Sequence, residues 1–266
     1  MIKFLNTYLF LILLLLFNYS NAQQTTINKK NNDAIDRNSI DKNKVMLIPF
    51  EPKLYMSEID YKICSETKLS TKEVKHQFRD GINEQIGLAF KSEKISSVDL
   101  MSDSAKFKKE LYSIYSNLSY EYQKVPNQEN YQPPKKEKDK KEINKGQIVV
   151  ETNTDERFMN AKVTNAKLIP LLGAKYKCNY FIFINQLDIK ASGNSRPGQI
   201  STGVENRKII VHYTVFSLDA KEINSGIAEE EFSTTLNNPK KIIDKHFSKV
   251  AQLISTRTIK ALAVPK

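Results

Sequence analysis

The stretch that most constrains the fold is Asn179–Asn185 (NYFIFIN), which is apolar at consecutive positions. The strand pattern extends from there toward Ile189. An uninterrupted apolar run is typical of an interior strand that is covered on both faces of a sheet. Residues 207–218 and 223–235 are two further strand patterns, on either side of the turn residues Asp219–Glu222. They predict an antiparallel hairpin, so the chain is expected to build a sheet around an interior strand.

Helical patterns supply the layer that covers this sheet. A capping box at Ser70–Glu73 starts a helix whose apolar residues recur every four positions over residues 74–90. Pro239 stands at the favoured first position of a last helix, in which residues 243–261 keep one face apolar. Each apolar stripe is expected to pack on the sheet or on another helix.

The remaining elements complete an alternating order. Further strands are predicted at 44–50 (KVMLIPF), 94–100 and 147–150, and further helices at 105–124 and at 153–172, the second ending at Gly173. This order predicts the α/β (α+β) class, as a single sandwich with a mixed sheet of about four to six strands. Helices are expected mainly on one face, and the C-terminal β-hairpin is followed by a long helix.

The N-terminus has the layout of a secretory signal peptide. Lys3 precedes an apolar run over Tyr8–Phe17, and small residues then lead to Ala22. The run is about half as long as the roughly 20 apolar residues that a membrane-spanning helix needs. We therefore expect a signal peptide at 1–22 that is cut after Ala22, and a periplasmic or secreted mature protein without a transmembrane segment.

The mature chain is expected to form one domain with two disordered stretches. Residues 23–43 are polar and non-periodic, which predicts a disordered leader. Residues 44–266 form the single α/β domain. Within it, the stretch at about 126–145 (PNQENYQPPKKEKDKKEINK) combines prolines and charges with almost no apolar residues, which predicts a disordered, solvated insert.

The net charge of +11 invites a nucleic-acid interpretation, which the residue types do not favour. Lysine supplies most of the positive charge, whereas arginine is the residue that binds phosphate and guanine bidentately. No basic patch is interleaved with stacking aromatic residues. Nucleic acid is therefore not an expected partner, and the basic surface suits an envelope protein or an anionic envelope polymer.

The sequence offers few groups for catalysis, and we predict that the chain is not an enzyme. Its three histidines, His76, His212 and His246, fall on helix and strand patterns away from any nucleophile motif. No metal-ligand spacing occurs and no glycine-rich phosphate loop is present, so neither a metal nor a cofactor is expected. The oligomeric state is left open.

The two cysteines, Cys64 and Cys178, both lie in the predicted mature domain. An oxidising compartment would permit a disulfide between them, and two unpaired buried thiols are the alternative. The spacing in the sequence does not decide between these two states.

The polar stretch after the first strand is the one candidate site. Residues 51–69 are predicted to form a long loop at the carboxyl end of strand 44–50, the side on which open α/β sheets place their ligand crevice. Its candidate binding residues are Leu54, Tyr55, Glu58 and Asp60. A binding surface and plain packing both fit this loop. As an alternative function, Glu58 and Asp60 would be the acid and base of a carboxylate-dependent hydrolase acting on envelope material.

Four stretches carry a family resemblance: KVMLIPF, NYFIFINQLDI after a helix and Gly173, the turn SLDAKEINSG, and the closing helix from Asn238. In this order they resemble the small periplasmic α/β domain of the TolB N-terminal, CsgG and LpoB group, over about residues 44–262. Members of that group are envelope proteins that act by binding partners. The resemblance therefore implies a non-catalytic binding or scaffold protein of the cell envelope.

This chain departs from the lipoprotein members of that group because it has no cysteine at the expected cleavage site, and the insert at about 126–145 is additional. The stretches Lys145–Val150 and Arg157–Asn160 also resemble secreted proteins of Bacteroidetes whose function is uncharacterised.

Overall fold

The computed structural model of the chain describes residues 37–103, 105–134, 143–144, 147–148, 156–191 and 206–263. The chain divides into two units, 1–37 and 38–266, and the fold below is that of the second unit. The predicted signal peptide and the leader as far as residue 36 lie outside the described residues. None of the helices in the described ranges is both long enough and apolar enough to cross a membrane.

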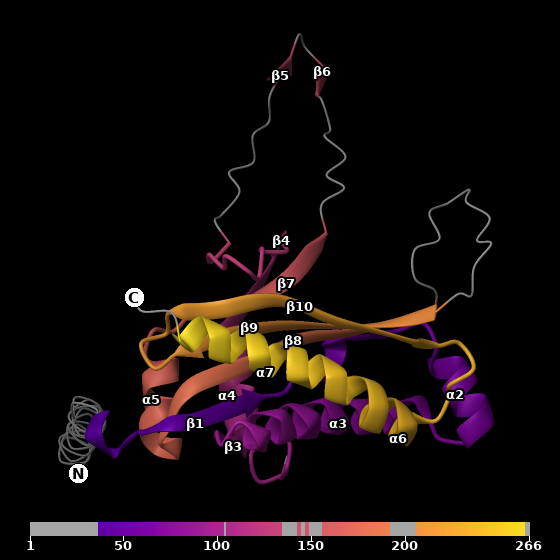
Figure 1. Ribbon diagram of the computed structural model, residues 1–266, viewed down its shortest axis with the longest axis horizontal. Helices are drawn as coiled ribbons and strands as arrows, with labels where there is room; N and C mark the ends of the chain where they lie inside the picture. The colour runs from indigo at the N-terminus through magenta and orange to yellow at the C-terminus, as the bar shows by residue number, and fades with distance from the viewer. Residues whose placement is uncertain are drawn as a thin grey trace, which may run out of the picture. The chain divides into compact units, whose positions relative to one another are not determined.

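A six-stranded mixed sheet forms the centre of the second unit (Figure 1). Its strands are β1 (Asp41–Ile48), β2 (Tyr55–Ser57), β3 (Ser96–Asp99), β8 (Cys178–Lys190), β9 (Asn206–Ser217) and β10 (Glu222–Ser233). They lie in the order β10-β9-β8-β1-β3, and β2 pairs with β8 beyond the end of β1. β1 runs parallel to β3 and β8, whereas β8, β9 and β10 are antiparallel. The predicted mixed sheet and C-terminal hairpin are confirmed.

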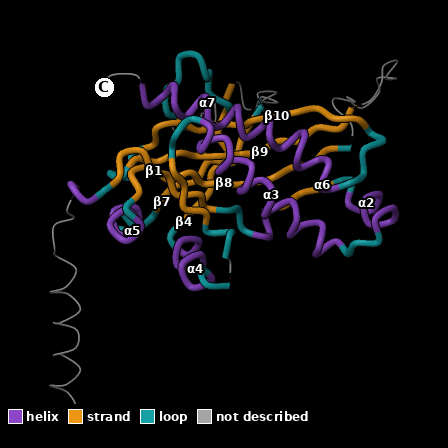
Figure 2. Tube along the Cα trace, turned by 60° about the horizontal axis from the view of Figure 1, so that its bottom comes forward, coloured by secondary structure: helices purple, strands orange, loops and turns teal. Residues whose placement is uncertain are grey.

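Helices cover one face of this sheet. They are α3 (Thr71–Ser92) and a C-terminal run made of α6 (Pro239–Ile242), the π-helical turn η3 (Ile243–Phe247) and α7 (Ser248–Ala263). In Figure 2 the C-terminal run follows β9 and β10 along their length. The predicted capping box of α3 is present, and Pro239 is the first residue of α6. α3 and η3 pack closely at Gly81, where an added Cβ would lie 2.7 Å from the side chain of Ile243.

A second layer lies on the opposite face of the sheet. It contains the antiparallel pair β4 (Leu118–Lys124) and β7 (Arg157–Val163), with α4 (Lys108–Ser116) and α5 (Leu168–Tyr176) beside it. β7 meets the sheet through side chains: the amide of Met159 donates to Nδ1 of His212 at 2.9 Å, and that of Ala161 donates to Oγ1 of Thr214 at 3.1 Å. β7 packs against β8, β9 and β10, and Figure 1 shows it beside β10.

Two of the predicted helices are partly wrong. The helix predicted at 105–124 ends at Ser116, and its last seven residues form β4. The helix predicted at 153–172 is strand β7 in its middle; the helix begins only at Leu168 and passes through Gly173 to Tyr176. Both errors have one cause, because β4 and β7 are each other's hydrogen-bonding partners and neither strand is specified by local periodicity alone.

The predicted loop at 51–69 and the predicted insert also differ from expectation. The loop contains a 3-10 turn (η2, Pro52–Leu54), β2 and a helix, α2 (Asp60–Thr67). In the insert, the side chains of Gln128 and Tyr131 are hydrogen-bonded to β10, and residues 135–142 lie outside the described residues. Two-residue strands β5 (Ile143–Asn144) and β6 (Gln147–Ile148) pair with each other. A short 3-10 turn, η1 (Arg37–Ser39), and β1 already occupy the end of the predicted leader.

The structure excludes the disulfide that the sequence left open, since both cysteines are free. Cys178 begins β8, whereas Cys64 lies on α2, directly after a strand that pairs with residues 187–189 at the other end of β8. A strand rises about 3.3 Å per residue, so these two ends are roughly 30 Å apart. A disulfide requires Cα atoms within about 7 Å. Burial raises the pKa of the Cys178 thiol to about 11.

Candidate functional site

The residues of the predicted binding loop do not form one surface. Tyr55 is a core residue, 7% exposed, with its ring centroid 6.4 Å from those of both Phe50 and Phe78. Its hydroxyl donates to Oδ1 of Asp60 at 2.6 Å. Burial, together with this bond, holds the pKa of Tyr55 well above its ordinary value. The pair of Tyr55 and Asp60 therefore fastens the start of α2 to the core.

The other two predicted residues lie apart from that pair. Leu54 is half-buried at the end of η2, and Glu58 is exposed. Glu58 accepts a hydrogen bond from the amide of Ala191 at 2.9 Å and lies 3.5 Å from Nζ of Lys190. Glu58 and Asp60 are thus bound to different partners, and the carboxylate pair of the hydrolase alternative is not assembled.

The crevice expected at the carboxyl end of β1 is filled by two side chains. The guanidinium of Arg79 donates to the carbonyl of Phe50 at 2.7 Å and to the hydroxyl of Tyr115 at 2.8 Å. That hydroxyl donates in turn to the carbonyl of Pro49 at 2.7 Å. Burial raises the pKa of Tyr115 to about 12, although Arg79 opposes the rise. The hydrogen-bonded side chains of Arg79 and Tyr115 therefore occupy this end of the sheet.

Two of the three histidines are buried and have polar partners. His212 is 4% exposed; its Nδ1 accepts the amide of Met159, and its Nε2 faces Oδ2 of Asp188 at 3.5 Å. His246 is also buried, with Nδ1 3.1 Å from Glu230, whereas His76 is exposed on α3. In the described part of the chain, no serine or cysteine is hydrogen-bonded to any of these imidazoles. Among the residues with described placement, they therefore activate no serine or cysteine nucleophile.

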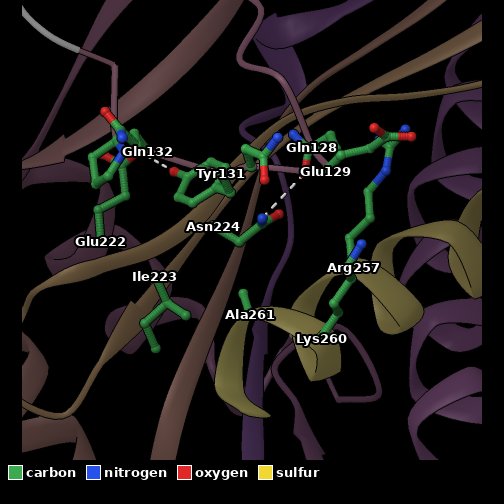
Figure 3. Close-up of a pocket in the computed structure, with 12 residues that line it drawn as sticks. Gln128, Glu129, Tyr131, Gln132, Glu222, Ile223, Asn224, Arg257, Lys260 and Ala261 are labelled. Carbon is green, nitrogen blue, oxygen red and sulfur yellow. Dashed lines mark hydrogen bonds between the residues drawn. The ribbon is translucent and has the colours of Figure 1, made fainter. Parts of the chain in front are cut away.

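A cleft at the edge of the sheet is a candidate site that is formed by described residues. It has a volume of about 450 Å³ and lies between residues 128–133, the start of β10 and the end of α7. Figure 3 shows Tyr131 and Asn224 in the middle of its lining, with Glu222 at one end and Arg257 at the other. The size falls within the range of roughly 300–1,000 Å³ that is usual for small-ligand sites.

The first wall of the cleft is the segment 126–134, which follows β4. The side-chain amide of Gln128 donates to the carbonyl of Ser225 at 2.7 Å and accepts from that of Asn224 at 3.1 Å. The hydroxyl of Tyr131 donates to Oε1 of Glu222 at 2.8 Å. These bonds satisfy polar groups at the exposed edge of β10, so the segment is fixed by the strand it covers.

Gly226 makes this close approach possible. Its φ of +144° is a conformation that L side chains rarely adopt, and an added Cβ would lie 2.6 Å from Nε2 of Gln128. A glycine inside a long strand pattern often marks such an approach of another backbone or a bulge. It is the signal by which the sequence could have located this wall.

Glu222 holds the two layers and the first wall together. Its carboxylate accepts hydrogen bonds from Tyr131, Asn160, Lys162 and Ser225, at distances between 2.7 and 3.4 Å. Burial and this carboxylate hold the pKa of Tyr131 well above its ordinary value. A second cavity of about 350 Å³ lies on another side of Glu222, against Lys162 and Phe216.

The second wall of the cleft is formed by α7. Arg257 donates through Nη1 to the carbonyl of Ile227, so its guanidinium is anchored to the outer edge of β10. Lys260 is exposed and follows three positions later, which places it on the same side of the helix. Ala261 completes this wall. The cleft thus has two walls that are each bonded to one strand.

Sequence reasoning missed this site because it treated 126–145 as a solvated insert and assigned no role to Arg257. Tyr131, an aromatic residue inside a polar stretch, was the second available signal, after Gly226. Among the residues whose placement is described, no group of three or more His, Cys, Asp or Glu side chains is arranged to hold a metal ion.

Comparison with known proteins finds no matching family model, no matching curated protein and no matching solved structure.

Proposed function

We propose that this chain is a non-catalytic binding or scaffold protein of the cell envelope, periplasmic or secreted, and that its partner docks in the cleft between residues 128–133 and α7. The observation that carries the proposal is the cleft itself. It is a concave site of ligand size, and both of its walls are hydrogen-bonded to β10. Such a site is formed before the ligand arrives, which lowers the entropic cost of binding.

The lining suits recognition by hydrogen bonds. The side chains of Asn130 and Gln132 are exposed in the cleft, and the ring of Tyr131 lies between polar neighbours. A few placed polar groups beside apolar surface, here Ile223 and Ala261, are the usual composition of a specific binding site. The expected partner is an envelope protein or an anionic envelope polymer, as the basic composition also favours.

Sedimentation of the purified protein with the insoluble envelope fraction of the producing cells tests this proposal. Lys260→Glu reverses a charge in the cleft, and Lys245→Glu is the matched control, because Lys245 is equally exposed on the same C-terminal helical run but does not line the cleft. We expect Lys260→Glu to lower the bound fraction severalfold and Lys245→Glu to leave it unchanged, with equal melting temperatures for both variants.

Two results would count against the proposal. Equal retention of both variants would mean that the cleft is not the docking site. Turnover of a peptidoglycan or ester substrate that Glu58→Gln abolishes, with the fold intact, would favour the hydrolase alternative over a binding role. A Tyr55→Ala variant is unsuitable for either test, because Tyr55 is part of the core.

Export is part of the proposal. N-terminal sequencing of the protein recovered from the periplasm or the medium should give a chain that begins at Gln23, directly after Ala22. Recovery of the whole chain from the cytoplasm would contradict it.

A further inference from the structure

The charges that line the cleft are not distributed evenly. Glu222 lies at one end, and Glu129, Arg257 and Lys260 are the other charged residues of the lining (Figure 3). Figure 3 places Glu129 at the same end as Arg257. One end of the cleft therefore presents an acid and two bases from opposite walls.

The acid at the far end is not available to a ligand. Glu222 already accepts hydrogen bonds from four groups, including the ammonium of Lys162 at 3.1 Å, and its side chain is only 10% exposed. A carboxylate with its acceptor sites filled in this way has little capacity for another donor. Glu222 acts as a structural anchor, and recognition of charge falls to the other end.

Glu129, Arg257 and Lys260 are differently placed. Glu129 and Lys260 are exposed, and in the described part of the chain neither side chain has a hydrogen bond or ion pair. Arg257 uses Nη1 for the carbonyl of Ile227 and also interacts with the hydroxyl of Tyr213, which fixes its direction and leaves the remaining guanidinium donors for a ligand. Glu129 and Arg257 face the same cleft without pairing with each other.

From this layout we propose that the cleft recognises the head group of an α-amino acid, which carries an ammonium and a carboxylate on one carbon. The carboxylate lies against Arg257 and Lys260, because a guanidinium offers parallel donors to two oxygens. The ammonium lies against Glu129 on the facing wall. The amino-acid side chain then extends past Tyr131 and Ile223 toward Glu222. This inference rests on the proposed function and names the ligand class for the same site.

The head group has two sources, a free amino acid and an amino acid that is joined to an envelope polymer through its side chain. Both present the same ammonium and carboxylate chemistry to the cleft when the two groups share a carbon. The experiment therefore begins with free amino acids and returns to the envelope fraction afterwards.

Calorimetric titration of the purified protein with the twenty free L-amino acids is the first arm. The best binder is then compared with its N-acetyl form, which lacks the ammonium, and with its amide, which lacks the carboxylate. We expect the N-acetyl form to bind about threefold to fivefold more weakly than the free amino acid, because it loses one exposed charge pair. The amide, which loses charge pairs to both Arg257 and Lys260, should bind about tenfold more weakly.

Two neutral variants assign the two halves of the head group. Glu129→Gln should weaken binding of the free amino acid about threefold to fivefold relative to the wild type, since exposed charge pairs contribute modestly. Its affinity for the N-acetyl form should equal that of the wild type, because this form has no ammonium to pair with Glu129. Lys260→Gln should likewise weaken binding of the free amino acid, and its affinity for the amide form should equal that of the wild type. Glu93→Gln, an exposed glutamate at the end of α3, is the matched control and should change neither preference.

The outcomes separate this inference from the proposed function. If no free amino acid binds, or if the free and derivatised forms bind equally, the head-group assignment is wrong, whatever the envelope sedimentation shows. If free amino acids bind with the expected preferences and Lys260→Glu still sediments like the wild type, the assignment stands and the envelope docking proposal fails. Competition by the free amino acid in the sedimentation assay would identify a polymer-attached head group as the natural source.

Discussion

The two faces of the central sheet are covered in chemically different ways. On the face toward α3 and α7, the contacts are apolar: Phe78 and Phe247 are fully buried with ring centroids 5.3 Å apart. On the face toward β7, buried Asn160 donates to Gln123 at 3.0 Å and accepts from Thr214 at 2.6 Å. The first face depends on burial of apolar area, whereas the second combines a buried apolar cluster with directed hydrogen bonds.

Because of this difference, the two layers have separate roles: one mainly supplies stability, and the other fixes the arrangement of β7. Apolar packing is non-directional and supplies most of the free energy of folding. Buried hydrogen bonds add little net stability but are costly when one partner is missing, so they fix a single arrangement of β7. β4 leads directly into the segment 126–134, and the polar face therefore also positions the first wall of the cleft.

The largest expected effect is on the apolar face. Phe78→Ala removes a fully buried ring and should lower the free energy of unfolding by about 3–5 kcal/mol, because a cavity remains. Chemical denaturation gives the value. Leu88→Ala is the matched control on the same helix, since Leu88 is 50% exposed, and its change should stay within about 0.5 kcal/mol. Equal losses for both variants would contradict the apolar assignment.

On the polar face, Asn160→Ala should cost about 1–3 kcal/mol, because Gln123 and Thr214 lose a buried partner. The loss should be local. Hydrogen exchange of the amides of Met159 and Ala161 is expected to speed up while that of α3 stays unchanged. Faster exchange spread evenly over both faces would show that the two layers do not differ as described.

A third test concerns the bond that joins β7 to His212. Nδ1 of His212 accepts the Met159 amide at 2.9 Å, and Nε2 faces Asp188. Burial alone would raise the pKa of Asp188, but the imidazole of His212 and the amide of Gln186 lower it overall. His212→Leu removes the acceptor and should therefore weaken the protection of the Met159 amide against hydrogen exchange.

His212→Gln provides the comparison, because a glutamine oxygen can accept the same bond. This variant should keep more of the protection of the Met159 amide than His212→Leu does. His76→Leu, on the exposed side of α3, should leave that protection unchanged. Wild-type protection of Met159 in His212→Leu would remove His212 from this role.

The smallest expected effect concerns Glu229, at the outer part of the polar face. Burial raises its pKa, Lys208 at 3.3 Å opposes the rise, and Glu156 adds to it. A raised folded-state pKa means that the folded protein binds this proton more tightly. The resulting stability is present below the unfolded value of about 4.3 and is lost as pH rises through the folded value.

At neutral pH the ionised Glu229 therefore costs stability, and Glu229→Gln should raise the free energy of unfolding by up to about 1 kcal/mol. The gain should shrink in acid, which thermal melts at several pH values would measure. Glu231→Gln, exposed on the same strand, should change stability by less than about 0.5 kcal/mol. A loss of stability in Glu229→Gln would show that its pair with Lys208 outweighs burial.

Elements with a long pattern of their own were predictable from the sequence. The interior strand β8, the hairpin of β9 and β10, the capped helix α3 and the C-terminal helical run all carry their period within one segment. β2 is different, because three residues become a strand only through pairing with residues 187–189 of β8. β4 and β7 likewise needed each other.

The candidate site divides in the same way. The expected location at the carboxyl end of β1 followed a general rule for α/β sheets, and the side chains of Arg79 and Tyr115 close that location. Tyr55 was chosen as an aromatic in a polar stretch, yet its ring is buried among other rings. The cleft escaped prediction because its lining comes from segments about 35 to 130 residues apart, 128–133, 222–224 and 257–261.

By itself, the sequence determined the fold class, the interior strand, the hairpin and the apolar stripe of each long helix, because periodicity acts over neighbouring residues. Only the tertiary structure decided that 118–124 and 157–163 are strands, that Cys64 and Cys178 are far apart, and that Glu129, Arg257 and Lys260 line one cleft. The physical reason is that each of these depends on contacts between distant segments, which form only when the sheet brings the segments together.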